Sequence, residues 1–306
     1  MKILVSGSMA YDYIMDFWDS FKNHILPDKI HMLNVSFFTP SLTKQKWWTG
    51  HNIAYNIGLL WEKSILLWVV WDDFKEKSKL IDYSNLYKIK DMQTASCYII
   101  NDKDNNQINA FYPGALSAEN TQNVPAIDIS YSIVSPNDKI VMMKHLKQSY
   151  ELKIKTFFDP GQMITSFTKE ELIDCLEYSN YLILNDYEYS LFLDKTSMSE
   201  EDLKKKLDKI IVTMWKDGVK IIDKKKEQKV NALKNINVAD PTWAWDAFRA
   251  WLITWLHNSY TWEVSAKLWC LTASYCIEKY GTQNHTFTKK DFEKRFMKEY
   301  KEKVEL

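Results

Sequence analysis

"DPTWAWDAF", residues 240–248, marks a junction where an irregular stretch enters a helix that carries Asp246 near its start. The apolar spacing of "WDAFRAWLITWLHN" predicts that helix. Backbone N–H groups are unpaired at a helix N-terminus, and the helix dipole favours negative charge there. The junction is therefore a candidate phosphate site, with Asp246 placed to accept a proton from an attacking hydroxyl. An acidic residue that only complements the helix dipole would look the same in the sequence.

Two tryptophans, Trp243 and Trp245, stand inside this junction, and they belong to an unusual composition. The chain has 13 tryptophans and 7 glycines, whereas average usage near 7% predicts about 20 glycines. Glycine allows positive φ and close approach of a phosphate to the main chain, and tryptophan allows neither easily. The candidate site thus carries tryptophan at positions where its chemistry would favour glycine.

Composition and charge exclude several classes of partner. The 306 residues carry 40 basic and 40 acidic side chains, so nothing favours a nucleic acid or an anionic membrane as partner. The four cysteines are not closely paired, which indicates free thiols in a reducing cytoplasm. The N-terminal "MKILVS" predicts a buried strand rather than a signal peptide, and no stretch reaches membrane-spanning length. We expect a cytoplasmic protein that binds a small molecule.

Apolar runs that alternate with helical stretches predict a parallel sheet covered on both faces. The expected strands are "KILVS", "SILLWVV", "KIVMM", "KIKTFFD", "YLILN" and "IIVTM", with a helix at about residues 50–61. "TASCYIINDKDNNQINAFYPG" instead predicts a hairpin, because two alternating strands flank a polar turn. With the segment around residues 10–45, this hairpin would build a smaller antiparallel sheet.

Three motifs become recognisable when glycine replaces tryptophan. Residues 240–248 then read D-P-T-G-A-G-D-A-F, and "KWWTGHNIAYNIGLLW" acquires a glycine pair before the helix that contains Asn52. "VTMWKDGV" becomes V-T-x-G-x-x-G, with Trp215 at the first glycine. Together with "GSMAYDYIMDF" and the N-x-x-E of "NDYE", these motifs resemble, in order and spacing, those of the PfkB or ribokinase-like family of sugar and nucleoside kinases. No Walker A or protein-kinase motif occurs.

The resemblance implies a single ribokinase-like domain over residues 1–306. Its fold would be a three-layer α/β/α arrangement with a mostly parallel central sheet, plus a small β lid from about residues 10–45 and 93–115. The implied cofactors are ATP and Mg²⁺. Dependence on a monovalent cation stays open, as does the choice between a monomer and a homodimer through the lid.

The resemblance also implies a role for each matching position. Asp246 would be the catalytic base, and the main chain of Trp243, Ala244 and Trp245 would form the anion hole for the phosphoryl group, in a loop shaped by Asp240 and Thr242. The substrate-binding residues would be Asp12, Trp48 and Asn52. The nucleotide-binding residues would be Asn185, Thr213 and Gly218, with Glu188 organising Mg²⁺ through water.

The implied reaction is transfer of the γ-phosphoryl group of ATP to a hydroxymethyl group. The N-terminal sequence resembles that of adenosine kinase-like members, which favours a nucleoside as substrate. Phe37 and Phe38 would either stack on the base of the nucleoside or belong to the core of the small sheet. A sugar such as ribose or a fructose-type substrate is the alternative. Residues 1–60 contain no arginine, which argues against a phosphorylated sugar.

The tryptophans admit three interpretations. In the first, the source reads the codon UGA as glycine, so that the motif positions carry glycine in the protein that is made. Alternatively the tryptophans are real and the chain is an inactive, ligand-binding relative. In the third interpretation they are ordinary core aromatics, as the four-residue spacing of Trp251 and Trp255 would suit. The third interpretation does not account for Trp47, Trp48 and the pair in the junction.

Overall fold

A nine-stranded sheet forms the centre of the computed structural model, which describes residues 2–47, 49–71, 74, 78–104, 106–117, 122–234, 236–237, 244–279 and 285–306. The strand order is β13-β12-β11-β10-β9-β8-β1-β4-β5. Neighbouring strands from β5 to β11 pair in parallel. The pairs β11–β12 and β12–β13 are antiparallel. The strands are β1 Lys2–Ser6, β4 Ser64–Val70, β5 Leu86–Lys88, β8 Ile129–Val134, β9 Lys155–Phe158, β10 Tyr181–Asn185, β11 Lys209–Thr213, β12 Val219–Ile222 and β13 Glu227–Val230.

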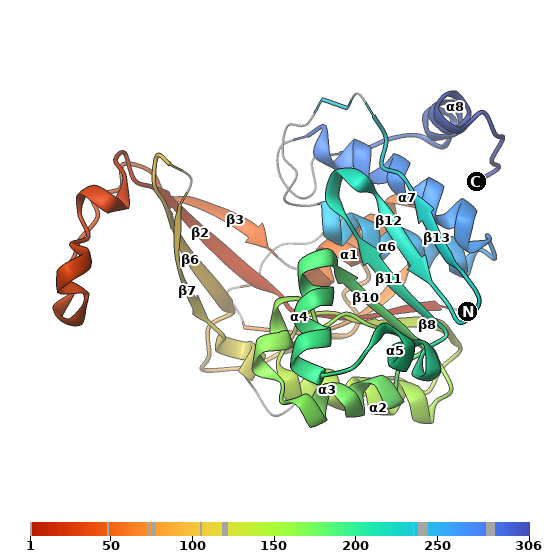
Figure 1. Ribbon diagram of the computed structural model, residues 1–306, viewed down its shortest axis with the longest axis horizontal. Helices are drawn as coiled ribbons and strands as arrows, with labels where there is room; N and C mark the ends of the chain where they lie inside the picture. The colour runs from red at the N-terminus through yellow and green to blue at the C-terminus, as the bar shows by residue number, and fades with distance from the viewer. Residues whose placement is uncertain are drawn as a thin grey trace.

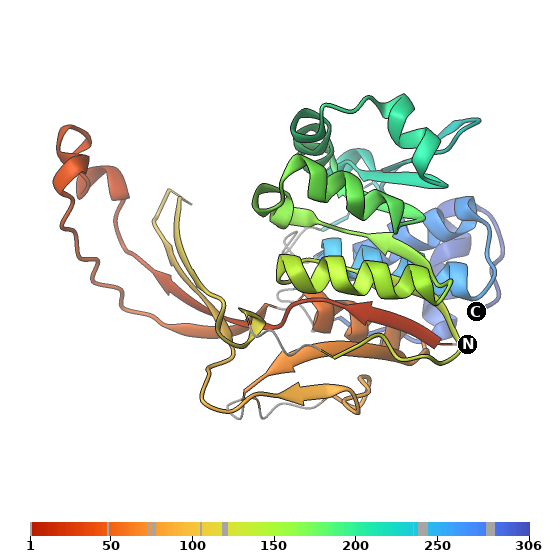
Figure 2. The ribbon, with the colours of Figure 1, turned by 90° about the horizontal axis from the view of Figure 1, so that it is seen from below.

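Helices cover both faces of this sheet (Figures 1 and 2). One face carries α1 Thr49–Leu59, α6 Ala244–His257 and α7 Trp262–Ile277, with α8 Lys289–Tyr300 outside α7. The other face carries α2 Lys139–Glu151, α3 Lys169–Glu177, α4 Asp186–Thr196 and α5 Glu200–Lys206. Alternate residues of one strand enter different cores, as Ile183 does on the first face and Leu182 and Leu184 on the second. This double burial explains why the strands read as continuous apolar runs, and it confirms the expected α/β fold.

One expected strand is wrong, because "KIVMM" begins helix α2. The Asp138 side chain caps the helix by accepting hydrogen bonds from the backbone N–H groups of Ile140 and Val141. Its buried residues, Val141, Met142, His145, Leu146 and Ser149, follow a helical period. A short apolar run does not by itself distinguish a strand from a buried helical turn. The strand of this region is β8, ten residues earlier in the chain.

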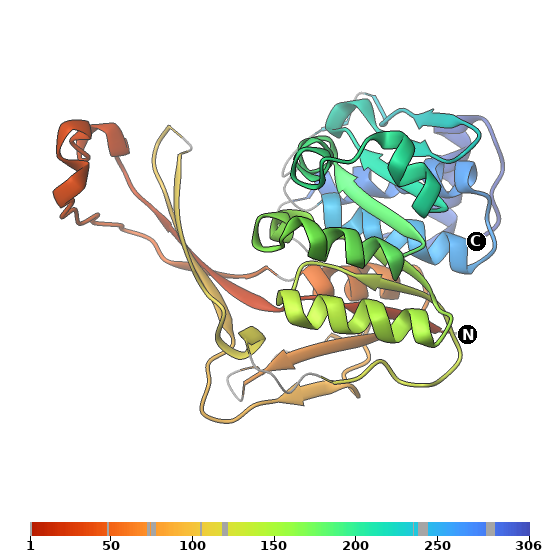
Figure 3. The same ribbon diagram turned by 60° about the horizontal axis from the view of Figure 1, so that its bottom comes forward.

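A separate four-stranded sheet, which we call the lid, has the order β3-β2-β6-β7 and projects from the body (Figures 1 and 3). The expectation of an antiparallel sheet is wrong for its central pair, because β2 and β6 pair in parallel, while β2–β3 and β6–β7 are antiparallel. Its strands are β2 Ala10–Asp16, β3 Thr43–Trp47, β6 Ala95–Asn101 and β7 Gln107–Tyr112. The predicted hairpin is confirmed as β6–β7, and Asp102 holds its turn by accepting from the backbone N–H groups of Asp104 and Asn106. Short 3-10 helices, Phe21–Asn23 and Pro27–Met32, lie at its far end.

Other expectations concern the chain as a whole. The four cysteines are free thiols. Within the described ranges, no helix combines the length and the apolar character that a membrane crossing requires. Phe38 and Phe111 are exposed.

Candidate active site

A cavity of about 440 Å³ lies between the lid and the carboxyl ends of the central strands. Asp12, Cys97 and Phe111 line it from the lid, and Asn137 and Gln162 line it from the body. In open α/β sheets, ligands bind outside the carboxyl ends of parallel strands. The cavity therefore occupies the expected place for a substrate and is large enough for a small organic ligand.

Asp12 on β2 is a buried carboxylate in the cavity wall. Neither of its carboxylate oxygens has a hydrogen-bond partner among the described residues, and burial raises its pKa to about 7. A buried polar group without a partner is costly, so hydroxyl donors from a ligand would stabilise it. Asp12 is thus a buried carboxylate without a described partner in the cavity wall, and its substrate-binding role stays a prediction.

The start of α1 packs closely against the segment after β1. A Cβ on Gly7 would lie only 2.8 Å from the Gly50 Cα, and the Gly50 N–H donates to the Ser8 carbonyl oxygen at 3.2 Å. Only glycines permit this approach of two backbones. The contact sets the position of α1, so that Thr49 lines the cavity while Asn52, one turn later, points toward α6.

Asp246 lies in the first turn of α6 and is 6% exposed. Asn52 Nδ2 donates to its Oδ2 at 2.9 Å, and Arg249 Nη1 lies 3.5 Å from its Oδ1. Burial raises the pKa of Asp246 to about 6, against the opposing effects of Arg249 and Asn52. The carboxylate is therefore mostly ionised at neutral pH and can accept a proton. Asn52, which we expected to bind substrate, is a hydrogen-bond donor to the proposed base.

The N-x-x-E residues, Asn185 and Glu188, lie together at the end of β10, where they have a structural role. Asn185 and Glu188 form a capping box at the start of α4: the Glu188 N–H donates to Asn185 Oδ1, and the Asn185 N–H donates to Glu188 Oε2. The box engages one carboxylate oxygen of Glu188. Burial raises the Glu188 pKa, and the nearby Arg249 opposes that rise.

Thr213 and Gly218 lie beside this cap, where β11 ends. Asn185 pairs in register with Thr213, whose hydroxyl donates to the Leu184 carbonyl oxygen at 3.2 Å. Gly218 has φ 87°, and a Cβ there would overlap the Val230 carbonyl oxygen. Glycine is thus required at this turn. The nucleotide-binding role of the three residues stays a prediction.

Part of the expected site falls outside the described residues. Trp48 and Trp243 lie there, together with Asp240 and Thr242. Ala244 and Trp245 are described as the first backbone residues of α6. The helix therefore begins where the sequence predicts it, while the anion hole itself stays a prediction.

The sequence did not single out Arg249 and Asp159. Arg249 forms a buried ion pair with Asp159, which directly follows β9. The available signals were the placement of Arg249 three residues after Asp246, on the same helix face, and an acidic residue in "FFDP" at the end of a buried strand.

Several described tryptophans fit their surroundings poorly. Trp61 and Trp215 have φ values of 64° and 46°, in the region that favours glycine. Four others are buried with an indole N–H that has no hydrogen-bond partner among the described residues: Trp68, Trp251, Trp255 and Trp269. Each such group costs about 1–3 kcal/mol. Trp61 and Trp215 thus adopt a backbone conformation that suits glycine, and the four buried indoles lack a described partner for their N–H groups.

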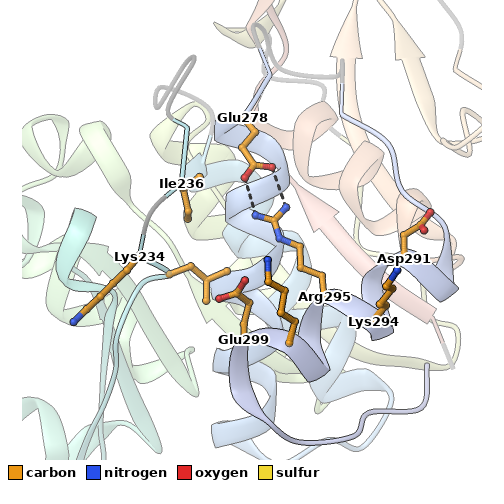
Figure 4. A pocket seen from close by; sticks show the side chains of 9 residues that line it. Lys234, Ile236, Glu278, Asp291, Lys294, Arg295 and Glu299 are labelled. Atoms are coloured by element: carbon orange, nitrogen blue, oxygen red, sulfur yellow. Dashed lines mark hydrogen bonds and ion pairs between the residues drawn. The ribbon is translucent and has the colours of Figure 1, made fainter.

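A second cavity, of about 520 Å³, is lined by residues of α7 and α8 and by Leu233, Lys234 and Ile236 (Figure 4). Its wall mixes charges of both signs. Arg295 there donates from both terminal nitrogens to Glu278, at 2.9 and 2.7 Å, and its guanidinium lies over the Tyr275 ring. Asp12 lines the cavity under the lid and does not line this second cavity, so we place the active site under the lid.

Comparisons with known proteins agree with this architecture. The family model for pfkB family carbohydrate kinases matches residues 49–289. A nucleoside kinase of Methanocaldococcus jannaschii is 30% identical over 291 residues, which cover 93% of each chain. The crystal structure of a M. jannaschii nucleoside kinase, described as an archaeal member of the ribokinase family, has a TM-score of 0.86 at 29% identity and covers 97% of this chain and 99% of that one.

A third relative was solved with ligands. The structure of Burkholderia thailandensis nucleoside kinase in complex with ADP-inosine has a TM-score of 0.82 at 29% identity, and the match covers 99% of this chain and 97% of that chain. The family resemblance predicted from the sequence is therefore confirmed. The chain belongs to the pfkB family of carbohydrate kinases and has its ribokinase-like α/β fold.

Proposed function

We propose that the protein transfers the γ-phosphoryl group of ATP to the hydroxymethyl group of a nucleoside, in a reducing cytoplasm that would preserve its four free thiols. The observation that carries the proposal is Asp12, a buried carboxylate without a described partner that faces the cavity under the lid. Neighbouring hydroxyls of a ribose would supply the donors that Asp12 needs. The relatives solved or named as nucleoside kinases support the same substrate class.

The described side chains support a division of labour. Asp246 would accept the proton of the hydroxymethyl oxygen as that oxygen bonds to the γ-phosphorus and ADP leaves. The first N–H groups of α6 would stabilise the charge on the transferring group. Closure of the lid would exclude water and protect ATP from hydrolysis. This scheme needs one carboxylate base and accurate positioning.

Mg²⁺ fits the chemistry at the end of β10. Within the described residues no group of three or more His, Cys, Asp or Glu side chains could hold a metal ion. Mg²⁺ commonly keeps several waters and binds through one or two carboxylates and the phosphates. Glu188, with one carboxylate oxygen outside the capping box, would hold the ion through water beside Asn185. The ion would neutralise charge on the phosphates.

The cavity favours a nucleoside over a phosphorylated sugar. No lysine or arginine is among the described residues that line it, so nothing there would pair with a substrate phosphate. Phe111 offers a half-exposed aromatic face for a base. Phe37, by contrast, packs on Phe17 and Phe21 at ring distances of 4.9 and 5.0 Å, and Phe38 projects into solvent. Phe37 therefore has the packing role in the small sheet rather than the base-stacking role.

Activity is tested with two chains: the tryptophan form, as printed, and a glycine form, with glycine at all 13 tryptophan positions. We expect ADP release by the glycine form to depend on adenosine or inosine. We call whichever chain turns over the active form. Turnover with ribose or fructose but not with nucleosides would replace the proposal with a sugar kinase. Nucleoside binding without turnover by either form, or by protein from the native source, would favour the inactive relative.

The pKa of Asp12 predicts a pH dependence of nucleoside binding. Burial raises this pKa to about 7 in the free protein, so Asp12 becomes protonated as the pH falls below 7. A protonated carboxyl accepts hydroxyl hydrogen bonds less well than a carboxylate. We therefore expect the KM for the nucleoside to rise as the pH decreases from 8 to 6, with little change in the KM for ATP. Steady-state kinetics of the active form and of Asp12→Asn measure this. An equally steep rise in Asp12→Asn would contradict the assignment.

A further inference from the structure

Arg249 lies between two buried acids. It follows Asp246 by three residues on α6, so both side chains leave the same face of the helix. Its Nη2 donates to Asp159 Oδ1 at 2.9 Å, its Nε makes an ion pair with Asp159 Oδ2, and its Nη1 lies 3.5 Å from Asp246 Oδ1. The side chains of Arg249, Asp159 and Asp246 are 10%, 0% and 9% exposed. One guanidinium thus bridges two carboxylates.

This bridge joins the proposed base to the wall of the nucleoside cavity. Asp159 follows β9 and precedes the 3-10 helix Gly161–Ser166, from which Gln162 and other side chains line the cavity. The Asp159 N–H also donates to the Val134 carbonyl oxygen at 2.9 Å, which ties this segment to the end of β8. A shift of the cavity wall would therefore be transmitted to Asp246 through Arg249.

The charges around Asp246 come from several elements. Asn52 from α1 donates to Asp246, Arg249 faces it from the next turn of α6, and Asp159 faces it from the end of β9. Glu188 from α4 is close enough to Arg249 to interact with it electrostatically. Arg249 is the cation that these three acids share, and a buried arginine is held in place by paired, directional contacts. Its planar fork reaches two acids at once, which a lysine cannot reproduce.

We propose that Arg249 is a positioning residue for phosphoryl transfer, because it holds the Asp246 carboxylate at a fixed place relative to the nucleoside wall by bridging it to Asp159. The inference rests on the proposed role of Asp246 as the base. Arg249 itself need not touch substrate or ATP. Its loss would both release the Asp246 carboxylate and remove the positive charge that keeps it ionised.

The test compares Arg249→Met and Arg249→Lys in the active form, with kcat and KM measured between pH 5 and 9. For Arg249→Met we expect kcat to fall about 100-fold, as misplacement of a catalytic group by about 1 Å can cause. The KM for ATP should stay nearly unchanged. The acidic limb of kcat/KM, which reports the free enzyme and hence the Asp246 pKa of about 6, should move to higher pH because Arg249 opposes the effect of burial. Arg249→Lys should restore the position of the limb but only part of kcat.

Two further variants separate this role from a structural one. The double variant Asp159→Asn with Arg249→Met removes both charges of the buried pair and should fold. Its acidic limb should move up by less than that of Arg249→Met, because Asp159 raises the Asp246 pKa while Arg249 lowers it. Arg295→Met is the matched control, since it breaks an arginine–carboxylate pair outside the cavity under the lid, the pair with Glu278 (Figure 4). It should keep the original kcat and limb.

Each outcome has a distinct meaning. An unshifted limb in both Arg249→Met and the double variant, with kcat reduced only in proportion to the folded fraction, would overturn the inference. Should Arg249→Met not fold, the double variant and Arg249→Lys decide the question by the same limb. Absence of nucleoside-dependent turnover in every form would instead be a failure of the proposed function, and it would be seen before any of these variants is made.

Discussion

Replacement of Asp246 by asparagine in the active form is expected to lower kcat by about 10²–10⁴-fold, the usual contribution of a positioned general base. The amide has nearly the same shape and can still accept the hydrogen bond from Asn52, but it cannot take a proton from the attacking hydroxyl. Affinity for the nucleotide should change little, because the carboxylate acts on the acceptor. Steady-state kinetics together with calorimetric titration of ADP measure the two quantities separately.

Asp174→Asn is a suitable control, because this acid is exposed on α3 and does not line the cavity under the lid. It loses the same charge and should keep full activity. Unchanged turnover in Asp246→Asn would remove Asp246 from its role. A large loss of nucleotide affinity would show that the residue acts mainly on the phosphates, and the proton acceptor would then have to be sought elsewhere.

The fold was predictable because its strands are buried on both faces. A strand such as β4, "SILLWVV", is buried at every position, and this leaves a continuous apolar run in the sequence. The same simplicity caused the error at residues 139–143, since an apolar run of that length also fits a buried helical turn. The deciding feature was the Asp138 cap. A capping residue before an ambiguous run therefore carries more information than the run itself.

The site was predictable only where one short motif holds the information. Asp12 and Asp246 were proposed as site residues in this way, and in the structure burial raises the pKa of each carboxyl. The contacts of Asp246 were not predictable, because Asn52 lies 194 residues away in sequence. The Arg249–Asp159 pair likewise joins residues 90 apart. Such pairs depend on how helices and strands pack, which a single sequence does not record.

The tryptophans illustrate how packing and polar satisfaction can disagree. Trp251 and Trp255 do lie buried in the same core cluster, and both have aromatic contacts with Phe292, as the core interpretation expects. Their indole N–H groups nevertheless have no described partner. With Trp68 and Trp269, four such groups would together cost about 4–12 kcal/mol, comparable to a whole folding free energy of about 5–15 kcal/mol. Hydrophobic burial alone therefore does not make these positions suit tryptophan.

The glycine form is expected to exceed the tryptophan form in nucleoside-dependent turnover by orders of magnitude, and to unfold at a higher temperature. The physical reason is twofold: a phosphate must approach bare main chain at the start of α6, and Trp61 and Trp215 adopt positive φ values that glycine tolerates without strain. A form with alanine at the same 13 positions is the matched control. It removes the indoles but keeps each Cβ, so it should gain stability while remaining less active than the glycine form.

Peptide mapping of protein from the native source should show glycine at positions 243 and 245. Indole-bearing peptides from an enzyme with full turnover would refute the interpretation that UGA is read as glycine.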